Sequence, residues 1–380
     1  MRTVSIVGAR PQFIKLAPVS RAMARSGISG GTAVDDFIVH TGQHYDAAMS
    51  DVFFEELMIP RPNVHLGVGS GPHGRQTGRM LEAIEAVLSE VVPDLVIVYG
   101  DTNSTLAGAL AASKLNLPIG HIEAGLRSRD RNMPEEINRI VTDHVSDLLF
   151  APTSTAVDNL QAENLADRTC LSGDVMLDAV LFNSQLAKAK SQILQRLSLS
   201  DAGYALATLH RASNTEAEEL LSILQTFSRI AVETIRVVFP VHPRTAAIIR
   251  SIGGAWRPPK ELILIEPTGY LDMLSLVSHC KLVLTDSGGL QKEALFLGRP
   301  CITLREQTEW PETIVAGGNV LTGTDPTKIH NAVQRVLGAE HGLHPDEDSR
   351  EQDVFGNGNA SEVIVQKLAE FHESKRTIKK

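Results

Sequence analysis

The segment HIEAGLRSRDRNMPEEINR, residues 121–139, gathers acidic and basic side chains in a way that could support chemistry. It holds four acids (Glu123, Asp130, Glu135 and Glu136), four arginines and no lysine. A salt-bridged surface loop would account for this composition. Carboxylates grouped around a substrate could instead stabilise a developing positive charge or move protons. The choice between these interpretations depends on the elements that position the segment.

Short apolar runs alternate with amphipathic stretches along the whole chain. The amphipathic stretches 74–91, 102–115 and 134–145 are predicted helices. The alternation predicts parallel sheets covered by helices on both faces, hence an α/β fold. The predicted strands are TVSIVG (3–8), DFIVHTG (36–42), DLVIVYG (94–100), LPIGHIEA (117–124), DLLFAP (147–152), YALATLH (204–210), TIRVVFPVH (234–242), ELILIEP (261–267), CKLVLTDSG (280–288) and PCITLR (300–305).

The strand pattern is interrupted over 174–203, a long helical stretch that ends in SLSDAG. A chain of 380 residues favours two domains. We therefore expect two doubly wound, Rossmann-like domains, residues 1–173 and 174–360. The polar, Gly/Asn-rich segment 344–360 is interpreted as a linker or loop, and 361–380 as one helix.

Ligands of such folds bind beyond the carboxyl ends of the strands, so the residues there are candidates for function. After the first strand, Gly8 is expected to allow a tight turn, and Arg10 and Lys15 flank a helix start. Two cations and free N–H groups suit a phosphate, although ordinary surface positions explain them equally well. Gln43 and His44 follow the second strand, as polar site residues or as parts of a turn.

Acids follow two further strands of the first half. Asp101 ends one strand and is either a helix N-cap or a functional carboxylate. Glu123 leaves a buried strand, where no helix explains it. Glu135 and Glu136 fall in the first turn of a helix that begins at Pro134, where the helix dipole favours acids regardless of function.

The second half repeats the arrangement with basic and small residues. His210 with Arg211 and His242 with Arg244 lie at the ends of two predicted strands. In LTDSGGLQKEA, the small residues Ser287, Gly288 and Gly289 begin a helix directly after a strand, which predicts an anion-binding site. Glu293, further along this helix, could accept hydrogen bonds from sugar hydroxyls. The histidines lack metal-ligand spacing, so no metal is predicted.

Composition narrows the partners. The formal net charge of −9 and the 4% aromatic content argue against a nucleic-acid partner. The same negative charge argues against binding to an anionic membrane. No run of about 18 apolar residues exists, and the N-terminal apolar run is too short for a signal peptide. Three cysteines, Cys170, Cys280 and Cys301, are interpreted as buried thiols. A cytoplasmic enzyme is expected.

Taken together, the motifs resemble the non-hydrolysing UDP-N-acetylglucosamine 2-epimerase family over about residues 1–360. The resemblance implies a two-domain, glycosyltransferase-B-like fold with the active site in the interdomain cleft and a final helix that crosses back to the first domain. It also implies a UDP-sugar substrate, a homodimer, and no cofactor or metal. The motifs that carry it are GARPQFIK, TGQHYD, YGDTNST, HIEAGLRS, MPEEINR, TLHRASN, PVHPRT and TDSGGLQKEA.

The family's site residues can be carried over where the motifs match. Its catalytic acids correspond to Asp101, Glu123 and Glu135, and its catalytic-site histidine to His210. Arg10 and Lys15 correspond to residues that face the diphosphate. The family's phosphate-binding turn corresponds to Ser287, Gly288 and Gly289, and its ribose ligand to Glu293. The predicted UDP-binding group also includes Arg305, His242 and Arg244.

The chain departs from the family pattern at several positions. Lys292 replaces the first acid of SGGxQEE, and NMPEE replaces SPWPEE. Asp46 in TGQHYD stands where members with an allosteric substrate site have an amide side chain, so this regulation is not expected here. TGQHYDAAMSDVFFEEL and REQTEWPE look more like the branch that includes UDP-2,3-diacetamido-glucuronate 2-epimerases, so that substrate is an alternative.

The resemblance implies elimination of UDP from carbon 1 with loss of the carbon 2 proton, followed by re-addition to the 2-acetamidoglucal. Because the transition state resembles an oxocarbenium ion, nearby carboxylates would lower its energy. A hydrolysing epimerase, a glycosyltransferase of the same fold and a non-catalytic nucleotide-sugar sensor are the alternatives. The sensor would lack the acids that this chain has.

Overall fold

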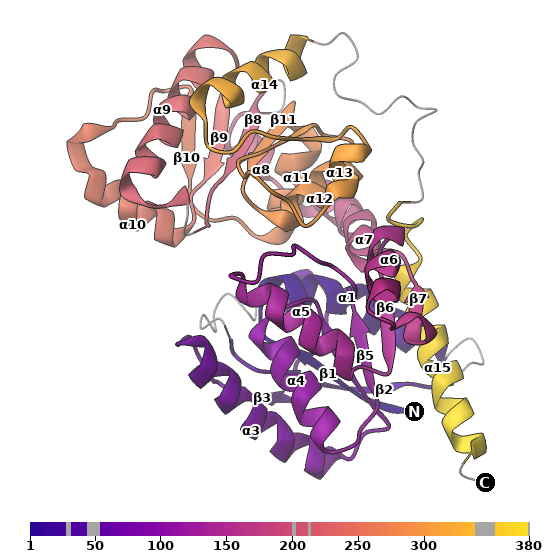
Figure 1. Ribbon diagram of the computed structural model, residues 1–380. Coiled ribbons are helices and arrows are strands. Elements are labelled where there is room, and N and C mark those ends of the chain that lie inside the picture. The colour runs from indigo at the N-terminus through magenta and orange to yellow at the C-terminus, as the bar shows by residue number, and fades with distance from the viewer. Residues whose placement is uncertain (28–31, 44–53, 200–202, 212–213, 339–353, 379–380) are drawn as a thin grey trace. The chain divides into compact units, whose positions relative to one another are not determined.

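The computed structural model describes residues 1–27, 32–43, 54–199, 203–211, 214–338 and 354–378 of the chain. The chain forms two compact units. Unit 1 comprises Met1–Ala179 and Gln352–Lys380, and unit 2 comprises Val180–Glu351. Helix α7 (Val175–Lys190) carries the chain from the first unit into the second (Figure 1).

Unit 1 contains a seven-stranded parallel sheet with the order β3-β2-β1-β4-β5-β6-β7. The order reverses between β1 and β4, the kind of position where such sheets bind ligands. The strands are β1 (Arg2–Val7), β2 (Asp35–His40), β3 (Val64–His65), β4 (Leu95–Tyr99), β5 (Ile119–Ile122), β6 (Leu148–Ala151) and β7 (Thr169–Leu171).

Helices cover both faces of this sheet. Helices α3 (His73–Val91) and α4 (Asn103–Lys114) bury one face in a core with alternate residues of β1 and β4, and α5 (Pro134–Val145) lies beside α4. On the other face, α1 (Arg10–Ser26) packs against α15 (Ala360–Ile378). Helix α6 (Ser154–Ala162) and the short 3₁₀ helix Ala166–Arg168 precede β7.

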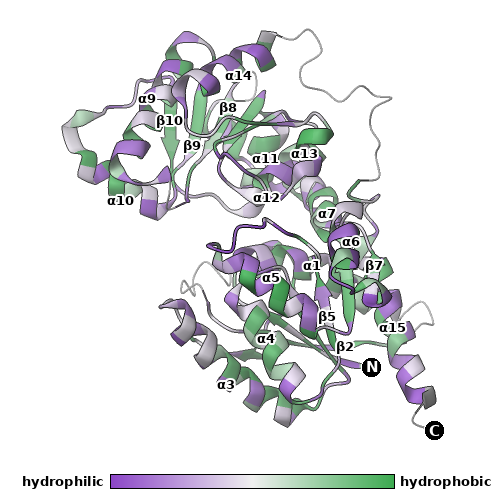
Figure 2. Ribbon diagram, in the orientation of Figure 1, coloured by the Kyte–Doolittle hydropathy of each residue, from purple (hydrophilic) through white to green (hydrophobic). Residues whose placement is uncertain are grey.

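Unit 2 contains a six-stranded parallel sheet with the order β10-β9-β8-β11-β12-β13, reversing between β8 and β11. One face packs on α9, α10 and α14, and the other on α8, α11 and α12. Figure 2 shows apolar strands β8, β9 and β10 beside helices with mixed surfaces. The elements are α8 (Ile193–Arg196), β8 (Ala205–Thr208), α9 (Ala217–Glu233), β9 (Val237–Pro240), α10 (Pro243–Ile252), a 3₁₀ helix Gly253–Ala255, β10 (Leu262–Ile265), α11 (Tyr270–His279), β11 (Leu282–Thr285), α12 (Gly288–Phe296), β12 (Cys301–Thr303), α13 (Pro311–Val315), β13 (Asn319–Leu321) and α14 (Pro326–Gly338).

The predicted fold class and strands are confirmed, since each predicted apolar run overlaps one observed strand. The long helix expected over 174–203 is wrong in part, because α7 ends at Lys190 and α8 follows as a separate turn. Cys280 and Cys301 are free and buried, as expected, whereas Cys170 is partly exposed. No helix among the described residues is long and apolar enough to span a membrane.

Candidate active site

Strand β4 delivers Gly100 and Asp101 to the carboxyl edge of the unit 1 sheet. Gly100 has a φ of +63°, the left-handed region that favours glycine. A Cβ atom there would lie 2.9 Å from Lys15 Nζ and 3.4 Å from Glu123 Oε1. The glycine therefore leaves room for two charged side chains that arrive from α1 and from the end of β5.

Lys15 and Glu123 form a buried ion pair between Nζ and Oε1. Their side chains are only 8% and 6% exposed. Glu123 itself has a φ of +71°, which is uncommon for a residue with a side chain. Such conformations cost of order 1–3 kcal/mol and persist where the surroundings hold them, often at functional sites.

Arg139 from α5 holds Asp101. Its Nε and Nη2 atoms donate to Asp101 Oδ2 at 3.0 and 2.7 Å, and Asn138 Nδ2 donates to the Asp101 carbonyl at 2.9 Å. Asp101 is not the helix N-cap, because Thr102 occupies that position before α4. The Asp101 carboxylate is 27% exposed and fixed in direction by a buried guanidinium.

The two neighbouring acids of α5 have different surroundings. Glu136 is 1% exposed and accepts from the N–H groups of Ser128 and Arg129 at 2.8 and 2.9 Å and from Arg139 at 3.0 Å. Although burial raises the pKa of Glu136, these donors lower it overall. Glu135 is half-buried, and no hydrogen bond or ion pair joins it to another described residue. Glu136 is thus a structural anchor, and Glu135 remains available for a ligand.

The first turn of α1 is locked to β4 by Gln12. Its Oε1 atom accepts from the N–H groups of Gly8 and Ala9 at 2.8 and 3.1 Å, and its Nε2 atom donates to the Tyr99 carbonyl at 2.9 Å. Gly8, which was expected to allow a tight turn, does not have a left-handed backbone. A Cβ atom there would lie 1.9 Å from Thr41 Oγ1, so close approach requires the glycine.

In unit 2, a buried carboxylate holds the histidine at the end of β8. Asp286 is fully buried, contacts His210 Nδ1 at 3.0 Å and accepts from the Arg211 N–H at 3.0 Å. Burial raises the pKa of Asp286, but His210 and the backbone donors outweigh it and lower the pKa. The His210 side chain is 44% exposed, so the pair presents an oriented ring.

His242 lies beside this histidine, with ring centroids 6.3 Å apart. It is the N-cap of α10, and its Nδ1 atom accepts from the Arg244 N–H at 3.2 Å. Both His242 and Arg244 are exposed. Two predicted site histidines therefore share one edge of the unit 2 sheet.

The predicted small-residue turn does begin a helix. Ser287 is the N-cap of α12, and its Oγ atom accepts from the Leu290 N–H at 3.4 Å. Glu309 lies so close to the turn that a Cβ on Gly288 would be 2.1 Å from its Oε1 atom. Arg305 Nη2 holds Glu309 at 2.8 Å.

The remaining predicted ligand of α12, Glu293, is 6% exposed, and the neighbouring Lys292 is 1% exposed. The Lys292 ammonium lies 3.6 Å from the centroid of the Trp310 ring, a cation–π contact. The chain thus places an aromatic partner on the residue that departs from the family motif.

The structure brings Lys15, Glu123 and the Asp101 strand end together, and it brings His210 near His242. No contact joins Glu135 to these groups within the described residues, and His44 and Asp46 lie outside that part of the chain. Sequence reasoning assigned no role to the supporting residues Gln12, Arg139, Asp286 and Glu309. Each lies within a motif that was singled out, but the sequence alone does not show which group each one contacts. The described residues contain no group of three or more His, Cys, Asp or Glu side chains that could hold a metal ion.

Comparison with known proteins identifies the family of the chain. The profile of the UDP-N-acetylglucosamine 2-epimerase family matches residues 28–369. A UDP-N-acetylglucosamine 2-epimerase homolog of Methanococcus maripaludis is 48% identical over 97% of this chain and 99% of its own length. The UDP-2,3-diacetamido-2,3-dideoxy-D-glucuronate 2-epimerase of Pseudomonas aeruginosa is 47% identical over 98% of this chain and 100% of its own. The crystal structure of the Methanocaldococcus jannaschii UDP-GlcNAc 2-epimerase with UDP-GlcNAc and UDP superposes with a TM-score of 0.86, at 43% identity, over 97% of this chain and 100% of that one.

Two parallel-sheet α/β domains, each with a reversal in its strand order, place the chain in the glycosyltransferase-B-like class of folds. The family profile and the full-length relatives make the assignment specific. The chain belongs to the UDP-N-acetylglucosamine 2-epimerase family and is an epimerase that acts on a nucleotide sugar.

Proposed function

We propose that the enzyme interconverts UDP-N-acetylglucosamine and UDP-N-acetylmannosamine without releasing free sugar. The observation that carries the proposal is the pair of carboxylates, Asp101 and Glu123, at the ends of adjacent strands β4 and β5, each held by a cation. Carboxylates fixed in this way can act as a base or stabilise an oxocarbenium-like transition state.

The reaction needs charge stabilisation because the carbon 2 proton has no adjacent carbonyl to acidify it. The C1–O bond to UDP breaks, the carbon 2 proton goes to a carboxylate, and a 2-acetamidoglucal remains. UDP then re-adds after a proton returns to the opposite face. Two unit charges ~4 Å apart at an effective permittivity of ~20 interact by about 4 kcal/mol. One well-placed carboxylate is therefore worth about 10³-fold in rate.

We assign the sugar of the substrate to unit 1 and its UDP group to unit 2. Asp101, Glu123 and Glu135 are the acid, base and cation-stabilising groups. The oriented ring of His210 and the N-cap turn of α12 support a role for unit 2 in holding the diphosphate. Arg10, Arg305, His242, Arg244 and Glu293 are assigned to UDP binding.

The test compares Asp101→Asn and Glu123→Gln with Asp130→Asn as a control from the same loop. The first two should bind UDP with unchanged affinity in calorimetry and lose about 10³-fold in turnover. Asp130 accepts from the Asn132 N–H at 3.0 Å, within its own turn, so its variant should keep turnover. Full activity of both carboxamide variants would refute the proposal.

The second candidate substrate is UDP-2,3-diacetamido-glucuronic acid. It is favoured by the Pseudomonas aeruginosa relative, whose 47% identity nearly equals that of the first relative. Rates with the two substrates at equal concentration decide between them. A kcat/KM higher for UDP-N-acetylglucosamine supports the first proposal, and the reverse assigns the enzyme to the uronic acid branch.

Homodimer formation and a cytoplasmic location stay predictions. The dimer is expected from the family resemblance, and light scattering of the purified protein would give its mass directly. A mass of twice 41.2 kDa is the expected result.

A further inference from the structure

The backbone around Glu123 adopts an unusual course. Glu123 and Gly125 have φ values of +71° and +82°, so two of three consecutive residues are left-handed. Glycine tolerates this region, but a glutamate does so at a cost. Something in the surrounding structure must hold Glu123 in this conformation.

The carboxylate of Asp143, on α5, contacts residues on both sides of Glu123 in the sequence. Its Oδ1 atom lies 2.7 Å from Nδ1 of His121, two residues before Glu123. Its Oδ2 atom accepts from the N–H of Gly125, two residues after, at 3.1 Å and from Arg127 Nη1 at 2.7 Å. One carboxylate therefore spans the five-residue segment centred on Glu123.

His121 extends this contact to the neighbouring strand. Its Nε2 atom lies 2.7 Å from the carbonyl oxygen of Gly100, the residue that precedes Asp101. Both His121 and Asp143 are fully buried. The same dyad thus ties the backbone at the end of β4 to the backbone at the end of β5.

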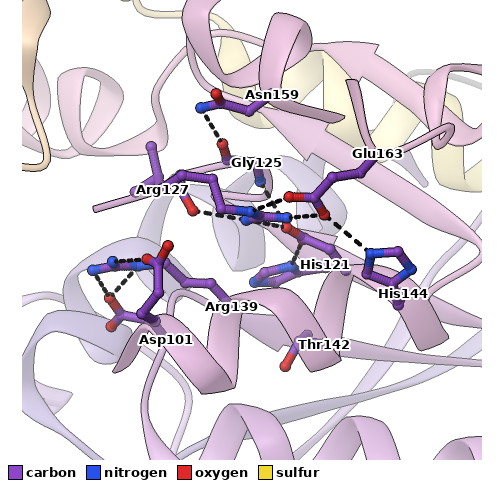
Figure 3. Close-up of polar contacts among 12 residues, drawn as sticks. Asp101, His121, Gly125, Arg127, Arg139, Thr142, His144, Asn159 and Glu163 are labelled. Carbon is purple, nitrogen blue, oxygen red and sulfur yellow. Dashed lines mark hydrogen bonds and ion pairs between the residues drawn. The ribbon is translucent and has the colours of Figure 1, made fainter. Parts of the chain in front are cut away.

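Arg127 and Asn159 also lie beside this segment, as Figure 3 shows. Arg127 donates through Nε and Nη2 to Glu163 at 2.7 and 2.8 Å, and Asn159 Nδ2 donates to the Gly125 carbonyl at 3.0 Å. Although burial raises the pKa of Asp143, contacts with His121 and Arg127 lower it. The carboxylate is thereby kept as an acceptor of all three donors.

We propose that Asp143 is a positioning residue of the epimerase: through His121 and Gly125 it fixes the left-handed backbone that directs the Glu123 carboxylate toward the substrate. This inference rests on the proposed function, in which Glu123 is catalytic. Asp143 itself, at 0% exposure, does not touch the substrate. Misplacement of a reacting group by about 1 Å costs about 10²-fold in rate, so the effect should be large.

The primary variant is Asp143→Asn, which keeps the shape but turns one acceptor oxygen into a donor. Its kcat should fall about 10²-fold, while KM changes by less than about 2-fold. UDP affinity should stay at the wild-type value. Glu163→Gln is the matched control, because it also weakens an ion pair of Arg127 but touches no backbone beside Glu123. It should keep wild-type kcat.

A double-variant cycle separates positioning from general destabilisation. If Asp143 acts through Glu123, adding Asp143→Asn to Glu123→Gln should cause no further loss of rate. The rates are measured with enzyme in excess of UDP-N-acetylglucosamine, where slow residual epimerisation accumulates. Multiplicative losses in the cycle would overturn the inference, as would wild-type kcat in Asp143→Asn.

A second variant keeps the test decisive if Asp143→Asn does not fold. His121→Gln leaves the Asp143–Arg127 pair intact and releases the Gly100 carbonyl, so it should show a smaller loss confined to kcat. A rise in KM with unchanged kcat would contradict the inference. If the wild-type enzyme epimerises no UDP-sugar at all, the proposed function fails before this inference is tested.

Discussion

Removal of the Lys15 ammonium should change the chemistry of Glu123 rather than the affinity for UDP. The family resemblance assigns Lys15 to the diphosphate, but in unit 1 its ammonium pairs with the Glu123 carboxylate. Both side chains are more than 90% buried, so water screens the pair weakly. The variant Lys15→Met keeps the length of the side chain and removes its charge.

The magnitude follows from the burial of the pair. Removing one partner of a buried ion pair typically costs about 3–5 kcal/mol, because the other charge is left uncompensated. Without Lys15, the buried Glu123 carboxylate loses the charge that compensates it, so the free energy of unfolding should fall by about 3–5 kcal/mol. Because the ion pair also holds the carboxylate in place, kcat should fall by about 10²-fold.

The assays are urea unfolding, steady-state kcat for UDP-N-acetylglucosamine, and UDP titration by calorimetry. Arg10→Met, the other cation of the motif, is the comparison variant. We expect Lys15→Met to lower stability and kcat with UDP affinity unchanged, and Arg10→Met to weaken UDP binding with stability and kcat unchanged. Unchanged stability and kcat with a large loss of UDP affinity in Lys15→Met would refute the pairing and restore the diphosphate role.

Three further predictions concern stability and orientation. Burial raises the pKa of Asp36 from 3.8 to about 6; because the folded chain holds this proton more tightly, the stability it contributes is complete below about pH 4 and is lost as pH rises through 6. The gain in free energy of unfolding of Asp36→Asn over the wild type should therefore be about 2–3 kcal/mol larger at pH 8 than at pH 4. Urea unfolding at both pH values measures the gain, and equal gains would contradict this prediction. Asp286→Asn should lower kcat about 10²-fold by freeing His210, seen in steady-state rates, and an unaltered kcat would exclude the orienting role. Gly288→Ala should lower the free energy of unfolding by about 1–3 kcal/mol, because its methyl group would lie 2.1 Å from Glu309 Oε1. Gly289→Ala should raise it by about 0.5–1 kcal/mol, because no atom lies nearer than 4.0 Å to the new methyl group. Thermal unfolding measures both changes, and the opposite order would refute the steric argument.

Central strands could be predicted from sequence because both faces are covered. LVIVY of β4 is buried at all five positions, so it forms an unbroken apolar run. The edge strands β3, β7 and β13 were not predicted. They are two or three residues long and partly exposed, which leaves no apolar run to recognise.

The site was predictable in position but not in its connections. Asp101 and Glu123 stand out because a charged residue directly follows a buried strand. Their partners do not: Lys15 lies 108 positions before Glu123, and Arg139 lies 38 positions after Asp101. Such pairs form only when the sheet order brings the strand ends together, so a single sequence gives no signal for them.

The most direct measurement is proton NMR of the purified enzyme with UDP-N-acetylglucosamine in deuterated water, with no acceptor or metal added. The proposed mechanism predicts growth of the UDP-N-acetylmannosamine anomeric signal with deuterium at carbon 2, because the eliminated proton exchanges before re-addition. Release of UDP and free sugar would contradict the non-hydrolysing mechanism. Epimerisation with full retention of the original proton would contradict the elimination route through carboxylates.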